Sequence, residues 1–230
     1  MARDEALLMR VGTHESPPTL RLYQWEPPTI SLGYFQRYAD FETLPSPLGG
    51  LAVVRRTTGG GAILHDLELT YSLTLPAEHE LLARGVQRLY ELAHDAIIAS
   101  LKSLHVDSAR DGESDGSGAA RGPFFCFERR HRFDVLTGRE KVAGSAQRRT
   151  RNAVLQHGSI ILADRFGRQT AARVPHDFET AVGMLRGRLV DDLARLAGVA
   201  LRPGDWSPDE LVMAANLIDK YTGPAWTRRT

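Results

Sequence analysis

Three consecutive glycines, Gly59 to Gly61, constrain more than any other feature what this chain can form. They follow a strand-like run at 51–55. An apolar pair comes after them and is followed by His65 and Asp66. Glycine has no Cβ, so the backbone here can take positive φ angles and approach a bound molecule closely. Successive unhindered N–H groups also form a concavity that suits a carboxylate, phosphate or carbonyl oxygen. We therefore predict a ligand-binding loop rather than a glycine-rich hairpin turn, which would have no use for the flanking arginines and the His-Asp pair.

The composition places the chain among ordinary globular proteins. Its 230 residues are 42% hydrophobic and 25% charged, which predicts one compact domain over 1–230 with a real core. The net charge of +1 gives no overall reason to bind nucleic acid. No apolar run is long enough for a membrane span, and the start, Met-Ala-Arg-Asp-Glu, lacks the features of a signal peptide. We expect a cytoplasmic protein.

Cys126 is the only cysteine, so an intramolecular disulfide is impossible and we predict no metal site. Positive charge gathers in two clusters, 129–132 and 148–151. Such clusters attract acidic partners, although each taken alone could also be solvated loop charge.

Apolar periodicity predicts both helices and strands. Strands at 19–25 and 29–34 flank the turn Glu26-Pro27-Pro28, which predicts a hairpin. Helical spacing predicts a short helix at 4–11, a long one at 81–104, a second at 176–196, and a third from Ser207 to about 221. Segment 108–122 is rich in Gly, Ser and Asp and is predicted to be a flexible loop. Further strands are expected at 51–55, 69–75, 133–136, 141–147 and 153–162. Together these elements predict an α+β fold, a mixed sheet with helices packed against it.

Three more positions carry candidate chemistry. Lys141 lies on a predicted strand beside small residues, 142–146, which leave room for a long ligand; a lysine can grip a carboxylate, phosphate or carbonyl. The alternative is a surface lysine on an edge strand. His157 is either a site residue or a structural histidine whose hydrogen bonds are satisfied within the fold. Cys126 lies among phenylalanines, as inert core cysteines do, but arginines follow at once, and cationic neighbours stabilise a thiolate.

Several segments, in this order, resemble the lipoate/biotin protein ligase and octanoyltransferase superfamily. The glycine loop, 55–66, is similar to its signature loop, and 141–147 (KVAGSAQ) to its catalytic lysine segment. Residues 155–162 (LQHGSIIL), the N-terminal helix and the two strands after it also match. The resemblance spans about 1–165 and is nearest to octanoyltransferases of the LipM type. It implies a mixed, mostly antiparallel sheet with packed helices and a narrow acyl tunnel.

The resemblance also implies a function. Members attach octanoyl, lipoyl or biotinyl groups to one lysine of an acidic carrier domain. The first hypothesis is therefore an octanoyltransferase that needs no cofactor: Cys126 takes octanoyl, or a related lipoyl group, from acyl carrier protein. The group then passes to a lipoyl domain or a glycine-cleavage H-type carrier protein. The second is an ATP-dependent lipoate or biotin ligase that uses Mg²⁺ and an acyl-adenylate. The third is a catalytically silent member that only binds a modified partner.

The residues predicted for this chemistry come from four segments. Cys126 and Lys141 are the expected catalytic pair, with the glycine-loop N–H groups stabilising the oxyanion. The expected substrate-binding residues are Arg55, Arg56, Thr58, Gly59, Gly60, Gly61, His65, Gly144, Ser145, Ala146, His157 and Gly158.

Overall fold

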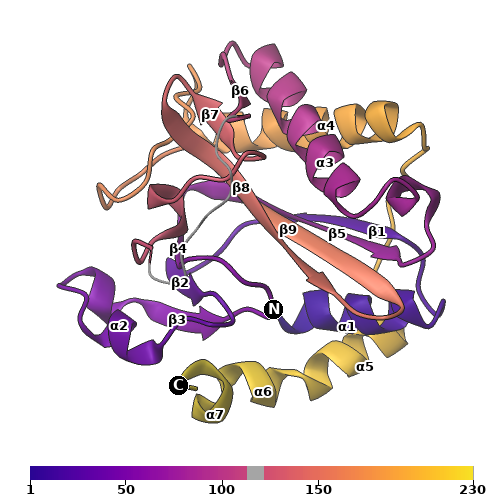
Figure 1. The fold of residues 1–230 in the computed structure, drawn as a ribbon, viewed down its shortest axis with the longest axis horizontal. Helices are drawn as coiled ribbons and strands as arrows, with labels where there is room; N and C mark the ends of the chain where they lie inside the picture. The colour runs from indigo at the N-terminus through magenta and orange to yellow at the C-terminus, as the bar shows by residue number, and fades with distance from the viewer. Residues whose placement is uncertain (113–121, 230) are drawn as a thin grey trace.

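The computed structural model describes residues 1–112 and 122–229. Its centre is a six-stranded sheet in the order β1-β5-β9-β8-β7-β6, whose neighbouring strands all pair antiparallel (Figure 1). A separate three-stranded sheet, in the order β3-β2-β4, pairs β2 parallel with β3 and antiparallel with β4. The α+β class with a mostly antiparallel sheet is thereby confirmed. The strands are β1 (Thr19–Tyr23), β2 (Thr29–Leu32), β3 (Ala52–Arg55), β4 (Ile63–His65), β5 (Glu68–Pro76), β6 (Ala109–Arg110), β7 (Val135–Thr137), β8 (Glu140–Arg149) and β9 (Ala153–Ile161).

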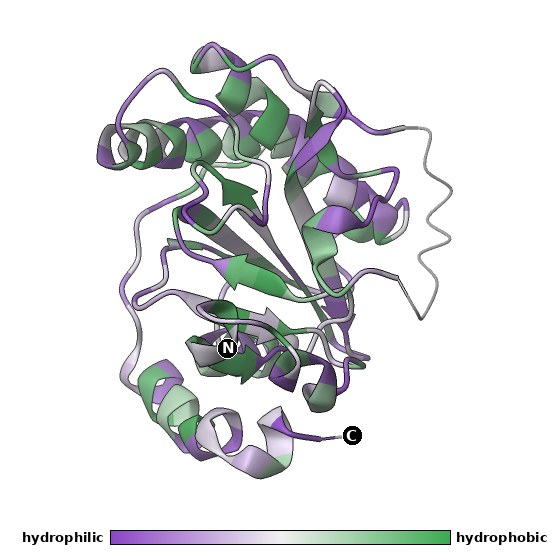
Figure 2. Ribbon diagram, turned by 90° about the vertical axis from the view of Figure 1, so that its left-hand side faces the viewer, coloured by the Kyte–Doolittle hydropathy of each residue, from purple (hydrophilic) through white to green (hydrophobic). Residues whose placement is uncertain are grey.

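Helices cover both faces of the large sheet. α3 (Gln87–Ser103) and α4 (Phe178–Ala197) pack together over one face, and α1 (Ala2–Gly12) lies on the other (Figure 1). Side chains of β9 alternate between these layers: Val154 joins the cluster under α3 and α4, whereas Leu155 packs with Leu8 of α1. Because both faces of β9 are covered, all its residues are buried. Figure 2 shows apolar and hydrophilic residues interspersed along the helices that cover the sheet.

The small sheet has a core of its own. It contains Ile30, Leu32 and Leu64, together with Phe41 from α2 (Tyr38–Glu42) and Phe125 from the segment before Cys126. A 3₁₀ turn, η1 (Leu48–Gly50), connects α2 to β3. The cluster also contains Ala62, next to the glycine loop. It therefore holds the glycine loop and the segment that carries Cys126 in fixed positions relative to each other.

The predicted hairpin at 19–34 is wrong. β1 pairs with β5 in the large sheet, and β2 lies in the small sheet. The connection 24–28 is longer than a tight hairpin turn and contains two prolines, so it carries the chain from one sheet to the other. Trp25, within this connection, turns inward and stacks on His65 with ring centroids 4.1 Å apart.

Two predicted helices differ in their extent. The helix expected at 81–104 begins only at Gln87, because a 3₁₀ turn, η2 (Glu80–Leu82), precedes it and Gly85 takes a φ of +93°. The helix expected from Ser207 to 221 does start with a capping box between Ser207 and Glu210. It is divided, however, into α5 (Pro208–Asn216), α6 (Ile218–Thr222) and α7 (Pro224–Thr227). Of the predicted loop 108–122, Ala109–Arg110 forms β6, and 113–121 lies outside the described residues.

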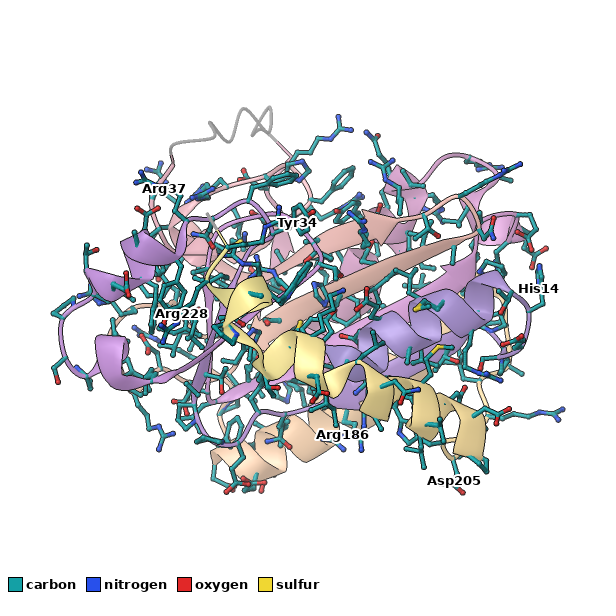
Figure 3. The ribbon with its side chains drawn as sticks, turned by 90° about the horizontal axis from the view of Figure 1, so that it is seen from below. His14, Tyr34, Arg37, Arg186, Asp205 and Arg228 are labelled. Atoms are coloured by element: carbon teal, nitrogen blue, oxygen red, sulfur yellow. The ribbon has the colours of Figure 1, made fainter. Side chains whose placement is uncertain are left out.

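The C-terminal helices run alongside α1 and return the chain to the small sheet. α5 packs on α1, and α7 reaches β3, as the view from below shows (Figure 3). None of the described helices is long and apolar enough to cross a lipid bilayer.

Candidate active site

Cys126 lies on a short segment that pairs with the end of the glycine loop. Its N–H donates to the carbonyl of Ala62 at 2.7 Å, and the N–H of Ala62 donates to the carbonyl of Phe124 at 2.9 Å. Phe125 is buried in the small core and anchors the segment. The Cys126 side chain itself is only half-buried, at the start of the 3₁₀ turn η3 (Cys126–Glu128). The sulfur is therefore accessible rather than enclosed by aromatic rings.

Lys141 reaches the cysteine from β8. Its Nζ lies 3.6 Å from Sγ of Cys126 and 2.9 Å from Oδ2 of Asp134, and the lysine side chain is 4% exposed. The Asp134 carboxylate also accepts the N–H of His131 at 2.8 Å. Burial lowers the pKa of Lys141, but negative charge on Cys126 and Asp134 outweighs burial and raises that pKa above its ordinary value. The lysine is thus a fixed cation that can stabilise a thiolate.

Arg56 holds the glycine loop from inside the protein. Its Nη2 donates to the carbonyls of Gly59 at 3.0 Å and Gly61 at 2.6 Å. Burial lowers the pKa of Arg56 to about 10, which leaves it charged at neutral pH. Gly60 takes a φ of +93°, and a Cβ there would lie 4.0 Å from Sγ of Cys126. A Cβ at Gly61 would lie 2.9 Å from the Cys126 nitrogen, so the glycines let the loop close against the cysteine.

Two cavities meet at Cys126. The inner one lies between the glycine loop and strands β8 and β9, and the outer one is a cleft flanked by Tyr90, Arg129 and Arg130. Ser145 and Ala146 line both cavities, and Lys141 lines the outer cleft. The predicted binding residues that line the inner cavity besides these are Arg56, Gly59, Gly60, His65, Gly144, His157 and Gly158, whereas Gly61 lines the outer cleft.

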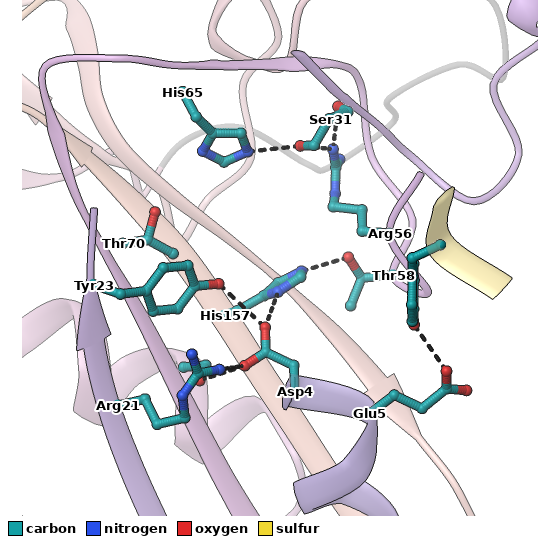
Figure 4. Close-up of polar contacts among 12 residues, drawn as sticks. Asp4, Glu5, Arg21, Tyr23, Ser31, Arg56, Thr58, His65, Thr70 and His157 are labelled. Carbon is teal, nitrogen blue, oxygen red and sulfur yellow. Dashed lines mark hydrogen bonds and ion pairs between the residues drawn. The ribbon is translucent and has the colours of Figure 1, made fainter. Parts of the chain in front are cut away.

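A buried carboxylate ties the glycine loop to the first helix (Figure 4). Asp4 of α1 accepts from Tyr23 at 3.1 Å, pairs with Arg21, and lies 3.6 Å from Nδ1 of His157. Nε2 of His157 lies 2.6 Å from the Thr58 hydroxyl. Burial alone would raise the pKa of Asp4, but His157 and Arg21 lower it far below its usual range. Thr58 therefore positions His157 and does not line either cavity.

A second network forms another wall of the inner cavity (Figure 4). His65 lies 2.5 Å from Glu68 through Nδ1 and 2.7 Å from the Ser31 hydroxyl through Nε2. Arg56 donates to the same hydroxyl at 2.9 Å. The network links the arginine that holds the loop to a histidine that also lines the cavity.

A third network fixes Ser145, which borders both cavities. Gln156 donates to the Tyr71 hydroxyl at 2.8 Å, and that hydroxyl lies 2.6 Å from Oγ of Ser145. Oγ lies 2.5 Å from Nε2 of His94, whose Nδ1 faces the Phe133 carbonyl. Because a carbonyl only accepts, Nδ1 carries the proton and Nε2 accepts from Ser145. Burial lowers the pKa of His94 to about 4, so the ring is neutral.

Arg55 lies away from both cavities, contrary to its prediction as a substrate-binding residue. Its guanidinium is fully buried and donates to carbonyls of Thr227 at 2.9 Å, Gly33 at 2.9 Å and Gln36 at 2.6 Å. Adjacent strand residues point to opposite sides, so Arg56 meets the glycine loop while Arg55 meets the C-terminal tail. Its role here is to hold α7 against β3.

Sequence reasoning missed Asp134, His94, Asp4 and Glu68. Asp134 gave one usable signal, an acid directly before an apolar strand. His94 and Asp4 face partners from distant segments, which spacing along the chain cannot reveal, whereas Glu68 lies only three residues after its partner His65. Across 1–112 and 122–229, no three His, Cys, Asp or Glu side chains gather as a metal site would require.

Comparison with known proteins agrees with this architecture. A family described as "Lipoyl protein ligase A/B catalytic domain" matches residues 1–174. The chain belongs to this family. An Octanoyltransferase LipM of Kyrpidia tusciae is 35% identical over 100% of this chain and 93% of its own length. Another, of Symbiobacterium thermophilum, is 42% identical with the same coverage.

Solved structures support the family's fold. A crystal structure of lipoate-protein ligase A bound with ATP superposes with a TM-score of 0.74 at 23% identity, covering 99% of this chain and 92% of that one. At this identity the likeness concerns the fold. The lipoyl protein ligase A/B catalytic domain therefore occupies most of the chain, from α1 through β9.

Proposed function

We propose that this protein is an octanoyltransferase that moves an octanoyl group from acyl carrier protein to a lysine of a lipoyl domain through a thioester on Cys126. The full-length relatives named Octanoyltransferase LipM support this activity. The observation that carries the covalent route is the 3.6 Å separation of the Lys141 Nζ and the Cys126 Sγ where the two cavities meet.

In the first half-reaction the Cys126 thiolate attacks the carbonyl carbon of the donor thioester. A new C–S bond forms, and the donor sulfur leaves with the electron pair of the broken bond and takes a proton from solvent. The Lys141 ammonium offsets the negative charge on the attacking sulfur. Asp134 holds that ammonium in place, since it lies 2.9 Å from Nζ on the other side.

The glycine loop supplies the electrostatic stabilisation of the tetrahedral intermediate. Arg56 binds the carbonyls of Gly59 and Gly61, which keeps these oxygens turned toward the guanidinium. Within the described residues, the N–H groups of Gly59, Gly60 and Gly61 donate to no protein acceptor. Free donors beside a reacting carbonyl are each worth about 3–4 kcal/mol of transition-state stabilisation in acyl-transfer enzymes.

The inner cavity takes the acyl chain. Ile63, Ala146 and Trp25 contribute apolar surface there, and burial of each methylene contributes about 0.8 kcal/mol. The acceptor lysine enters through the outer cleft. Its amine attacks the Cys126 thioester, loses a proton to solvent and forms the amide, while the sulfur leaves as a thiolate beside Lys141. Arg129 and Arg130, at this cleft, attract acidic partners.

Intact-protein mass spectrometry tests this function. Purified enzyme is mixed with octanoyl-loaded acyl carrier protein in the absence of ATP. We expect an octanoyl adduct that is lost in Cys126→Ser, and transfer of the group when a lipoyl domain is added. Transfer that requires ATP and survives Cys126→Ser would instead indicate an adenylating ligase, and no transfer by either route would indicate a protein that only binds.

A further inference from the structure

Phe35 is the most solvent-exposed of the large apolar residues that the structure describes, with 85% of its surface accessible. It follows β2, and its ring packs edge-on against Tyr34 with centroids 4.9 Å apart. An exposed aromatic ring costs free energy in water, and exposed apolar patches bordered by polar residues mark interaction sites. The mechanism proposed above gives this ring no role.

The loop that presents Phe35 is held firmly. The N–H of Tyr34 donates to the Thr58 carbonyl at 2.8 Å, and Gln36 donates to the Phe124 carbonyl at 3.0 Å. A Cβ on Gly33 would lie 2.0 Å from the Gly60 oxygen. The loop thus contacts the glycine loop and the cysteine segment, the two elements that position the sulfur. Phe35 is presented at the rim of the site on a rigid support.

Arginines lie against the tyrosines that flank Phe35 in this segment. The Arg229 guanidinium lies 4.2 Å from the Tyr34 ring centroid, Arg148 lies 5.8 Å from the same centroid, and Arg228 lies 5.3 Å from the Tyr38 ring. In Figure 3 Arg37 and Arg228 lie at the same end of the molecule, and Tyr34 lies nearer its middle. Asp40, on α2, pairs with Arg37 at 2.6 Å. The exposed Phe35 ring therefore adjoins several arginines.

We infer that Phe35, Tyr34, Arg148 and Arg229 form the docking surface for the acceptor domain, an acidic domain that presents the target lysine. This inference rests on the proposed function. Aromatic and arginine side chains dominate binding energy at protein interfaces, and a basic rim selects an acidic partner. The acceptor lysine reaches Cys126 through only four methylenes, so its domain must dock at the rim of the site, where loop 33–37 lies.

Half-reactions measured separately test this surface in the full chain. In Phe35→Ala we expect KM for the acceptor domain to rise at least about tenfold. Acylation of Cys126 by octanoyl-loaded acyl carrier protein, and transfer to a short lysine peptide, should each change less than about twofold. Val212→Ala, at a residue 60% exposed on α5, is the matched control and should leave all three rates unchanged. Arg148→Glu should weaken the acceptor step, whereas Arg188→Glu, on the exposed face of α4, should not.

Binding of the acceptor domain to Cys126→Ser enzyme gives a readout that does not need turnover. Adding Phe35→Ala to Cys126→Ser should lower this affinity at least about tenfold. If Cys126 takes no octanoyl group but Phe35 still governs this affinity, the proposed function fails and the docking surface stands. The inference is overturned if Phe35→Ala slows only the donor step, if it changes only the oligomeric state, or if it leaves both acceptor binding and transfer intact.

Discussion

Gly144 makes room for Lys141, three residues earlier on the same strand. A Cβ on Gly144 would lie 2.4 Å from Cε of Lys141 and 2.7 Å from its Nζ, far inside van der Waals contact. The missing side chain lets the lysine lie back along β8 and direct its ammonium group toward Cys126. The position of the fixed cation is thus determined by a glycine as much as by the lysine.

Gly144→Ala should therefore displace the ammonium group and leave the sulfur in place. We expect Cys126 acylation to slow at least about tenfold, because a hydrogen bond to a charged group contributes about 1.5–3 kcal/mol. Single-turnover mass spectrometry measures the rate. Gly187→Ala is the matched control, since a Cβ there meets nothing within 4 Å and alanine favours the helix. Equal rates for Gly144→Ala and wild type would contradict this account of Lys141.

Variants of the adjacent residues Arg55 and Arg56 should separate an effect on stability from an effect on catalysis. Arg55→Met removes the donors that hold the C-terminal tail, so we expect a loss of about 3 kcal/mol in unfolding free energy. The folded enzyme should keep its acylation rate within about threefold. Arg56→Met releases the carbonyls of Gly59 and Gly61 and should slow acylation at least about tenfold.

Urea denaturation and single-turnover acylation of both arginine variants check this contrast. A large rate loss in Arg55→Met at full folding would restore Arg55 as a substrate-binding residue. A normal acylation rate in Arg56→Met would remove the glycine loop from the mechanism.

Features set by residues close together in the sequence could be predicted, whereas features set by contacts between distant residues could not. The glycine loop, the strand that carries Lys141 and the cap at Ser207 follow from local chemistry, and each lies where it was expected. The prediction of a hairpin at 19–34 was wrong because tertiary packing decides which strands pair. Alternation of apolar and polar residues indicates a strand but does not identify its partner strand. The roles of Arg55 and Arg56 could not be separated, since which of two neighbours faces the cavity depends on the sheet around them.

The length of the acyl chain should control the first half-reaction. If the inner cavity takes the chain, each methylene removed from the donor loses about 0.8 kcal/mol of burial, or roughly a fourfold decrease. Hexanoyl carrier protein should therefore acylate Cys126 with a kcat/KM about 15-fold below that of octanoyl carrier protein. Single-turnover rates for butanoyl, hexanoyl and octanoyl donors measure this dependence. Equal rates for the three would show that the chain stays outside the cavity.

Stability should fall in mild acid because of His94. Burial lowers the pKa of this histidine to about 4 in the folded state, against 6.5 for an unperturbed histidine. As pH falls from 6.5, this histidine binds a proton in the unfolded chain but not in the folded protein. Its contribution to the free energy of unfolding is therefore fully present above pH 6.5 and is lost toward pH 4. The full effect is about 3 kcal/mol. Urea denaturation at pH 7 and pH 5 should show this decline. The lowered pKa of His157 acts in the same direction, so His94→Gln should reduce the decline without abolishing it.

His176→Gln, at an exposed position, is the control that should keep the wild-type decline. An unchanged decline in His94→Gln would show that the His94 ring is not the group responsible.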